Sequence, residues 1–208
     1  MHRWHGLTDF LLAMKYWSAV QEALVESGKF TSPAPLYGLP YSDGHRLNIP
    51  RGAGNEENAE GFTDYSILDE GPYFSIRTSG RSRANWRDDN PKSWFGTFDD
   101  AAKYFVARKS ASPTRSRLRN ASLEIINRRW LDRGLAPNWA EVSEPDPAGF
   151  ANAKRYFRFD EPDRYYFTVN PDTATSFLLN LTWREQILTF RDGIPDIERV
   201  SVPSFSDD

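Results

Sequence analysis

The sequence contains no cysteine, only two methionines and only three histidines. The missing cysteine excludes disulfides, thiolate nucleophiles and cysteine-ligated zinc. His2 and His5 lie beside a terminus, and His45 has no second ligand near it in the sequence, so we expect neither a zinc site nor a histidine-based triad. No Gly-rich phosphate loop and no Gly-x-Ser-x-Gly motif is present. The sequence therefore predicts no metal, no cofactor and no self-sufficient catalytic set.

The chain also lacks a long apolar run and a net positive charge. Without an uninterrupted hydrophobic stretch, neither a signal peptide nor a membrane span is expected, and we predict a cytoplasmic protein. The formal net charge of −3 is not that of a general nucleic-acid or anionic-membrane binder. The length of 208 residues suits a single domain, 1–208, with a frayed C-terminus.

What the sequence does have is a hairpin followed by a capped helix, between residues 62 and 109. Two apolar-rich runs flank a charged Gly-Pro turn over 65–76, which predicts a β-hairpin. Thr97 can cap a helix whose apolar positions from Phe98 to Val106 recur at helical spacing. An amphipathic helix beside a hairpin predicts an α+β fold, with an antiparallel sheet packed against several helices.

Other segments complete this outline. The spacing over 8–27 predicts a core helix, capped by Thr8 or Asp9, and the Pro/Gly-rich stretch 30–61 predicts a long loop interrupted by a short strand at 46–49. The segments 85–91 and 134–151 are expected to be loops, and 114–132 a second, basic helix that Ser112-Pro113-Thr114 separates from the first.

The last third predicts a second hairpin over 156–169, whose residue order resembles that of the first hairpin. We interpret this likeness as shared turn chemistry rather than as an internal duplication. The segment 173–190 fits both a helix and an alternating strand, and its length favours a helix. Residues 198–202 are expected to add an edge strand.

Two adjacent carboxylate pairs leave a hydrolase open as an alternative. Asp69-Glu70 and Asp160-Glu161 both fall in predicted hairpin turns. A carboxylate-dependent hydrolase acting on sugars or nucleotides needs two converging acids, one of them desolvated. Because turns are normally solvated, we expect both pairs to be ordinary surface residues.

The basic run over 103–133 is the argument for nucleic-acid binding, the other alternative. Its arginines would spread around most of a helix; they are Arg115, Arg117, Arg119, Arg128, Arg129 and Arg133. Tyr104 or Trp130 could stack on bases. The rest of the chain is acidic, however, and we expect this helix to pair internally with the acidic stretch 43–70.

Charge asymmetry and aromatic loops without a catalytic set favour recognition of another protein. Tryptophan, tyrosine and arginine are the residue types that most often anchor protein interfaces. The candidate partner-binding residues lie in two stretches, 37–46 and 86–89; they are Tyr37, Tyr41, Asp43, Trp86, Arg87, Asp88 and Asp89. Trp94 is expected to be a core residue.

The chain resembles the immunity factors of bacterial polymorphic toxin systems, in particular those that neutralise tuberculosis-necrotizing-toxin-type NAD glycohydrolases. The resemblance lies in 63–67 (Thr-Asp-Tyr-Ser-Ile), 72–74 (Pro-Tyr-Phe), 101–105 (Ala-Ala-Lys-Tyr-Phe) with Arg115, and 192–195 (Asp-Gly-Ile-Pro). It implies an α+β antitoxin without activity of its own, which binds a protein toxin and fills or masks its substrate cleft. The long Pro/Gly segment and the long basic helix depart from the family, so no blocking residue is carried over. The sequence leaves the toxin and the oligomeric state open.

Overall fold

The computed structural model describes residues 4–57, 61–82, 85–119, 123–124, 126–168 and 172–206. Its strands form one eight-stranded antiparallel sheet in the order β1-β2-β3-β4-β5-β8-β7-β6. The strands are β1 (Tyr41–Asp43), β2 (Arg46–Ile49), β3 (Gly61–Asp69), β4 (Phe74–Ser82), β5 (Asn85–Phe95), β6 (Trp139–Ser143), β7 (Lys154–Arg158) and β8 (Tyr165–Thr168). The α-helices are α1 (Leu7–Glu26), α2 (Phe98–Phe105), α3 (Ser112–Ser116), α4 (Arg128–Leu131), α5 (Ala174–Leu179) and α6 (Trp183–Arg191). Shorter turns are the 3-10 helices η1 (Ala53–Asn55) and η3 (Ile197–Arg199) and the π-helix η2 (Val106–Ala111).

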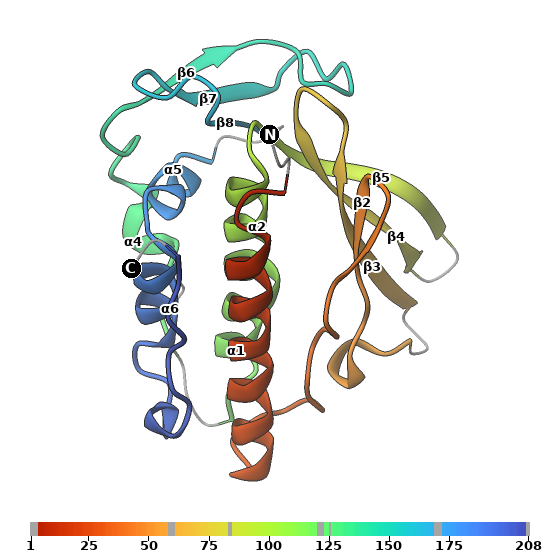
Figure 1. The fold of residues 1–208 in the computed structure, drawn as a ribbon, viewed down its shortest axis with the longest axis vertical. Coiled ribbons are helices and arrows are strands. Elements are labelled where there is room, and N and C mark those ends of the chain that lie inside the picture. The colour runs from red at the N-terminus through yellow and green to blue at the C-terminus, as the bar shows by residue number, and fades with distance from the viewer. Residues whose placement is uncertain are drawn as a thin grey trace.

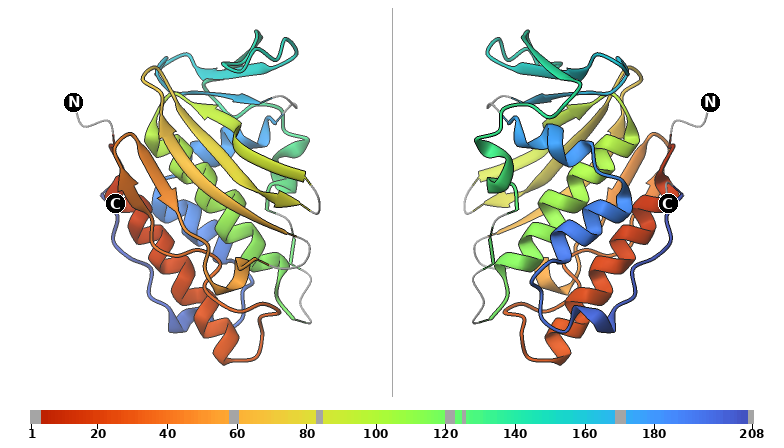
Figure 2. Two further views of the ribbon diagram at one scale, coloured as in Figure 1. Left: turned by 90° about the vertical axis from the view of Figure 1, so that its right-hand side faces the viewer. Right: turned by 90° about the vertical axis from the view of Figure 1, so that its left-hand side faces the viewer.

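The helices lie on one face of the sheet, as the predicted α+β fold requires (Figure 1). The left view of Figure 2 shows β2–β5 in front of the helices, and the right view shows α1, α2 and α6 in front of the sheet. One face of the long strands is therefore packed, and the other faces outward. In the described part of the chain, no helix has the length and apolar character needed to cross a membrane.

The core lies between α1, α2 and the packed face of the sheet. Phe105 of α2 is fully buried, and its ring lies 6.2 Å from that of Phe10 of α1 and 5.5 Å from that of Tyr65 of β3. Aromatic rings at such separations in tilted or edge-to-face geometry fill space efficiently. Aromatic side chains thus supply much of this core.

The predicted hairpin-and-helix unit is confirmed. β3 and β4 pair from Asp69↔Phe74 to Gly61↔Ser82, and the turn lies where the Gly-Pro pair predicts it. The Thr97 side-chain oxygen accepts a hydrogen bond of 3.1 Å from the backbone N–H of Asp100, which caps α2. Trp94 is buried, as predicted.

The second half follows the prediction in outline. The second hairpin is β7 and β8, and the segment 173–190 is helical. The helix is interrupted, because Thr182 begins α6 with a capping box to Glu185. The predicted loop 134–151 contains β6, and residues 197–199 form η3 instead of the predicted edge strand.

The prediction of a loop over 85–91 is wrong, because these residues begin β5. The segment pairs with β4 through two register shifts, which accommodate Pro91 and the positive φ of 45° at Asp89. Its side chains are mostly exposed because it forms the free end of a long strand. The polar composition of 85–91 is typical of a loop, so it does not reveal that the backbone of this segment pairs with β4.

The prediction of a long helix over 114–132 is also wrong. α2 continues through η2 into α3, so that Pro113 lies in the first turn of α3 and does not separate two helices. The chain then pairs with the segment after α1: the N–H of Arg119 donates to the Lys29 carbonyl, and Leu118 forms a β-bridge with Phe30. These non-local bonds replace the helical ones.

The start of α1 differs as well. Its N-cap residue is Gly6, without a side-chain cap, in place of the predicted Thr8 or Asp9. Asp9 instead accepts a hydrogen bond of 3.0 Å from the backbone N–H of Ser206. The carboxylate thereby holds the C-terminal segment against α1.

Candidate functional site

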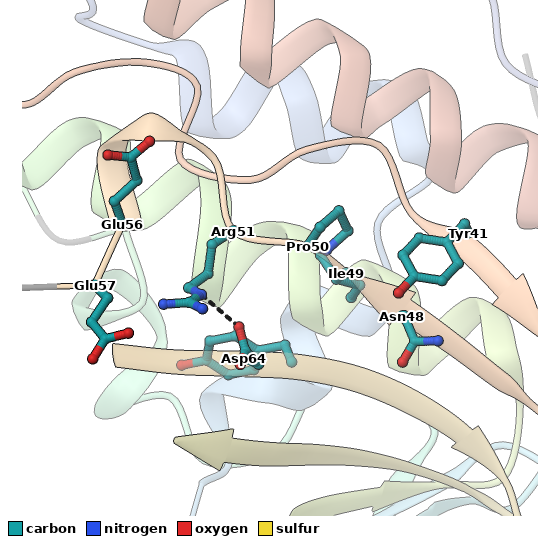
Figure 3. Close-up of a pocket in the computed structure, with 9 residues that line it drawn as sticks. Tyr41, Asn48, Ile49, Pro50, Arg51, Glu56, Glu57 and Asp64 are labelled. Carbon is teal, nitrogen blue, oxygen red and sulfur yellow. Dashed lines mark ion pairs between the residues drawn. The ribbon is translucent and has the colours of Figure 1, made fainter. Parts of the chain in front are cut away.

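An open cavity of about 770 Å³ lies at the β1 edge of the sheet, between β2, β3 and the segment that follows β2 (Figure 3). The cavity is lined by Tyr41, Asn48, Ile49, Pro50, Arg51, Glu56, Glu57, Asp64 and Tyr65. It is the largest of the cavities described here, and it contains one of the predicted partner-binding residues, Tyr41.

Arg51 is fixed at this cavity by two contacts. Its Nε donates to Asp64 Oδ1 at 2.7 Å, and its guanidinium carbon lies 4.2 Å from the centre of the Phe62 ring. A carboxylate and an aromatic face together restrict a side chain that would otherwise be mobile. The guanidinium is thereby presented in one defined orientation.

Acidic side chains lie on the segment that crosses above Arg51 in Figure 3. Glu56 and Glu57 are both exposed, and Glu57 accepts a hydrogen bond of 2.7 Å from Arg81 of β4. Because such surface pairs contribute little stability, these charges are available for recognition of a partner.

Trp86 extends this surface along β5. Its ring is 5.8 Å from that of Phe62, and 64% of the residue is exposed. Phe62 therefore lies between Arg51 and Trp86. An exposed tryptophan that packs against a second aromatic ring is a typical anchor for a protein partner. Tyr41, on the edge strand β1, is 58% exposed at the other end of the same surface.

We refer to these side chains as the Arg51 surface. It consists of Tyr41, Arg51, Glu56, Glu57, Phe62, Asp64, Arg81 and Trp86. Tyr41 and Trp86 are among the residues predicted from the sequence, whereas Arg51, Phe62 and Asp64 are not. The alternation of Phe62 and Asp64 along β3, both pointing away from the core residue Tyr65, is the signal that would have found two of them. Asp43, also predicted, is exposed at the end of β1, and its charge acts on Arg46.

Of the other predicted residues, Tyr37 lies in the core. It is 7% exposed, and its ring packs against those of Tyr65 and Phe105. Burial, and then the neighbouring Tyr65, raises the pKa of the Tyr37 hydroxyl far above its ordinary value. Arg87 is exposed but lines a different cavity on β4 and β5. We therefore leave both residues out of the Arg51 surface.

Asp89 belongs to an ion-pair network on the outward face of the sheet. Arg46 donates to both of its carboxylate oxygens, at 2.7 and 3.0 Å, and Arg77 Nε lies 3.1 Å away. Arg77 also pairs with Glu70 at 2.9 Å. The hydrogen bond from Arg46, and then the charge of Arg77, lowers the pKa of the Asp89 carboxyl. The Asp89 carboxylate is thus already paired with two arginines of the same chain.

This network predicts a pH dependence of stability. A carboxyl with a lowered pKa contributes stability above its unfolded-state pKa, and this contribution is lost as the pH falls through its folded-state pKa, within about pH 5 to pH 2. Asp89→Asn should therefore be less stable than the wild type at neutral pH and should lose less stability on acidification. Urea midpoints measured across that range test this.

Asp88→Asn is the matched control, because exposed Asp88 accepts a weak hydrogen bond of 3.5 Å from Ser79, and its charge acts on Arg46 less than that of Asp89 does. Its acid dependence should follow that of the wild type. Parallel curves for wild type and Asp89→Asn would contradict the role of the network.

The two carboxylate pairs do not behave alike. Asp160 and Glu161 are exposed and pair with Arg158, as expected of turn residues. Asp69 is buried, and its Oδ1 accepts a hydrogen bond of 2.9 Å from the N–H of Gly71, so the expectation of a solvated pair is wrong there. Glu70 is half-buried against Arg77.

The basic residues over 103–133 make contacts mainly outside the acidic stretch. Lys103 pairs with Asp99 at 3.0 Å, and Arg115 donates to the carbonyls of Phe190 and Glu124. The predicted pairing with 43–70 is therefore wrong, apart from a hydrogen bond from Arg117 to Asn55. Arg119, Arg128, Arg129 and Arg133 are exposed, whereas Lys103 and Arg115 are buried and bonded internally, so the run does not present one continuous basic stripe. Trp130 is likewise buried.

Within the described residues, no group of three or more His, Asp or Glu side chains lies close enough to hold a metal ion.

Comparison with known proteins gives a likeness of fold. No family model matches the sequence, and no curated protein matches it. Among solved structures, the fold is similar to that of Rv3902c from M. tuberculosis, with a TM-score of 0.50 and 12% sequence identity. The alignment covers 92% of this chain and 95% of that protein. At this identity, the likeness concerns the fold alone.

Proposed function

We propose that this protein is a non-catalytic immunity protein that binds a bacterial toxin enzyme and blocks its active site. The observation that carries the proposal is the Arg51 surface, where exposed Tyr41 and Trp86 flank charged side chains in fixed positions. Exposed aromatics combined with arginine are the composition of interface hot spots.

Two further findings support the proposal. The sequence resembles toxin-neutralising immunity factors at several separate segments, including 63–67 on β3. The fold is shared, over nearly the whole of both chains, with a protein of M. tuberculosis. The first supports the proposed role, and the second supports the α+β fold that such a role would use.

The charges of the Arg51 surface indicate what its partner carries. Glu56, Glu57 and Asp64 outnumber Arg51 and Arg81, so the surface is acidic overall. The complementary toxin surface should be basic, and the association rate should fall as the salt concentration rises.

Co-expression tests the proposal. The toxin to test is the product of any secreted-toxin gene that sequencing finds next to the gene for this protein in its host. The toxin should arrest growth when expressed alone, and this protein should restore growth and bind the toxin more tightly than about 1 μM. Arrest without rescue, together with no protein partner of that affinity in a pull-down from the host, would overturn it.

A further inference from the structure

A second cavity, of about 250 Å³, lies between β3, β4, β5 and the end of η2. The Nζ of Lys109 lies 5.4 Å from the centre of the Tyr65 ring, which packs against the core residues Tyr37 and Phe105, so Lys109 lies on the packed side of the sheet. The lining residues are Phe62, Thr63, Tyr65, Thr78, Ser79, Gly80, Arg81, Ser82, Arg87, Lys92 and Lys109.

The charges in this cavity are of one sign. No aspartate or glutamate is among the described residues that line it. Arg81 pairs with Glu57 outside it, whereas Arg87, Lys92 and Lys109 form no ion pair with a carboxylate in the described part of the chain. This contrasts with the outward face of the sheet, where Arg46, Arg51 and Arg77 all have acidic partners.

Lys109 is the least expected of these cations, because it is half-buried. Burial, and then the charges of Arg108 and Lys92, lowers the pKa of its amino group. The preceding residue, Arg108, has Asp172 as a partner at 2.8 Å, whereas no described acidic residue pairs with Lys109. A buried cation without a counter-ion is costly, and such groups concentrate at functional sites.

A third cavity, of about 500 Å³, adjoins the second and shares Lys109, Tyr65 and Arg81 with it. It adds Arg117, whose Nη1 is buried without a hydrogen-bond partner. The other terminal nitrogen of Arg117 donates to the neutral side chain of Asn55 at 3.1 Å. Cations therefore line this space from two elements, η2 and the end of α3, together with the carboxylate of Glu56.

We propose that this cavity is a binding site for a phosphate-bearing small molecule, with Lys109, Lys92 and Arg87 contacting the phosphate oxygens. Three unpaired cations carry more positive charge than one carboxylate would neutralise. Their charge matches the two or more negative charges of a phosphate or pyrophosphate group. The hydroxyls of Thr63 and Ser82 on the lining supply neutral donors of the kind that phosphate oxygens accept. The site shares Phe62 and Arg81 with the Arg51 surface, but its three unpaired cations are not part of that surface, and the proposal does not depend on the proposed immunity function.

Calorimetric titration of the full chain with pyrophosphate, at constant ionic strength, tests the site. Pyrophosphate should bind the wild type, and Lys109→Met should weaken binding by about tenfold or more, because a charged hydrogen-bond donor is lost. Lys15→Met is the matched control, since Lys15 is exposed on α1, and its affinity should be unchanged.

Thermal unfolding separates this role from a structural one. Without ligand, Lys109→Met should melt at a higher temperature than the wild type, because it removes an unpaired buried charge; a lysine that merely supports the fold would give a lower one. Absence of pyrophosphate binding to the wild type, or equal binding to wild type and Lys109→Met, would overturn the proposal. A loss of toxin affinity in Lys109→Met without pyrophosphate binding to the wild type would also overturn it, since the cations would then serve a carboxylate of the partner.

Discussion

Replacing Asp100 with alanine is expected to lower the free energy of unfolding by about 3–5 kcal/mol, since one partner of a buried ion pair is removed. The Asp100 side chain is 0% exposed and accepts two hydrogen bonds from Arg164, at 2.7 and 3.1 Å. Alanine would leave the Arg164 guanidinium with the Leu179 carbonyl as its remaining partner among the contacts described here. The pair joins α2 to the second hairpin, so both elements should lose stability together.

Urea unfolding of two further variants makes this test specific. In Asp100→Ala with Arg164→Met, the orphaned charge is removed as well, so the double variant should be more stable than Asp100→Ala alone. Asp160→Ala, which breaks the exposed pair with Arg158, should unfold close to the wild type. If Asp100→Ala lowers the free energy of unfolding by less than about 1 kcal/mol, which is the scale of a surface ion pair, the Asp100–Arg164 pair does not contribute as a buried one.

Replacing Trp86 with alanine is expected to weaken toxin binding by about 2–4 kcal/mol, or roughly 30- to 1000-fold in the dissociation constant. Trp86 is mostly exposed, and the ring contact described for it is with Phe62. Its removal should therefore leave the core and the unfolding midpoint nearly unchanged. Calorimetric or biosensor titration of the cognate toxin gives the affinity.

Phe159→Ala is the control for this prediction. Phe159 is 63% exposed, similar to Trp86, but it follows β7 at the other end of the sheet. Its truncation removes an aromatic side chain of similar exposure and leaves the Arg51 surface intact, so the toxin affinity should not change. An equal effect of the two substitutions, or an effect below about threefold for Trp86→Ala, would place the interface elsewhere.

The elements that the sequence predicts correctly are those with local signals. Thr97 caps its helix through the N–H of a residue three positions away, and the turn after Asp69 uses the Gly-Pro pair beside it. The missed elements depend on distant partners. β5 is a strand because β4 lies beside it, and the segment after Ser116 leaves the helix because Lys29 and Phe30 offer backbone partners.

The candidate site shows the same division. Tyr41 and Trp86 are exposed, which agrees with their interpretation as surface aromatics. Tyr37 lies in the same stretch of sequence as Tyr41 but is buried in the core. No local pattern distinguishes these tyrosines. The Arg46–Asp89 pair joins residues 43 positions apart, so only the strand register brings them together. The basic cavity around Lys109 likewise depends on where η2 ends against β3.

The two edges of the sheet bear on how the protein behaves at high concentration. An edge strand offers unpaired backbone groups that can recruit a strand from another molecule and start polymerisation. Here β1 is three residues long and ends at Asp43, and β6 is five residues long with Glu141 at its centre. Short edges that carry negative charge repel their own copies, so the fold disfavours fibre growth while β1 leaves room for a different, cationic chain to approach.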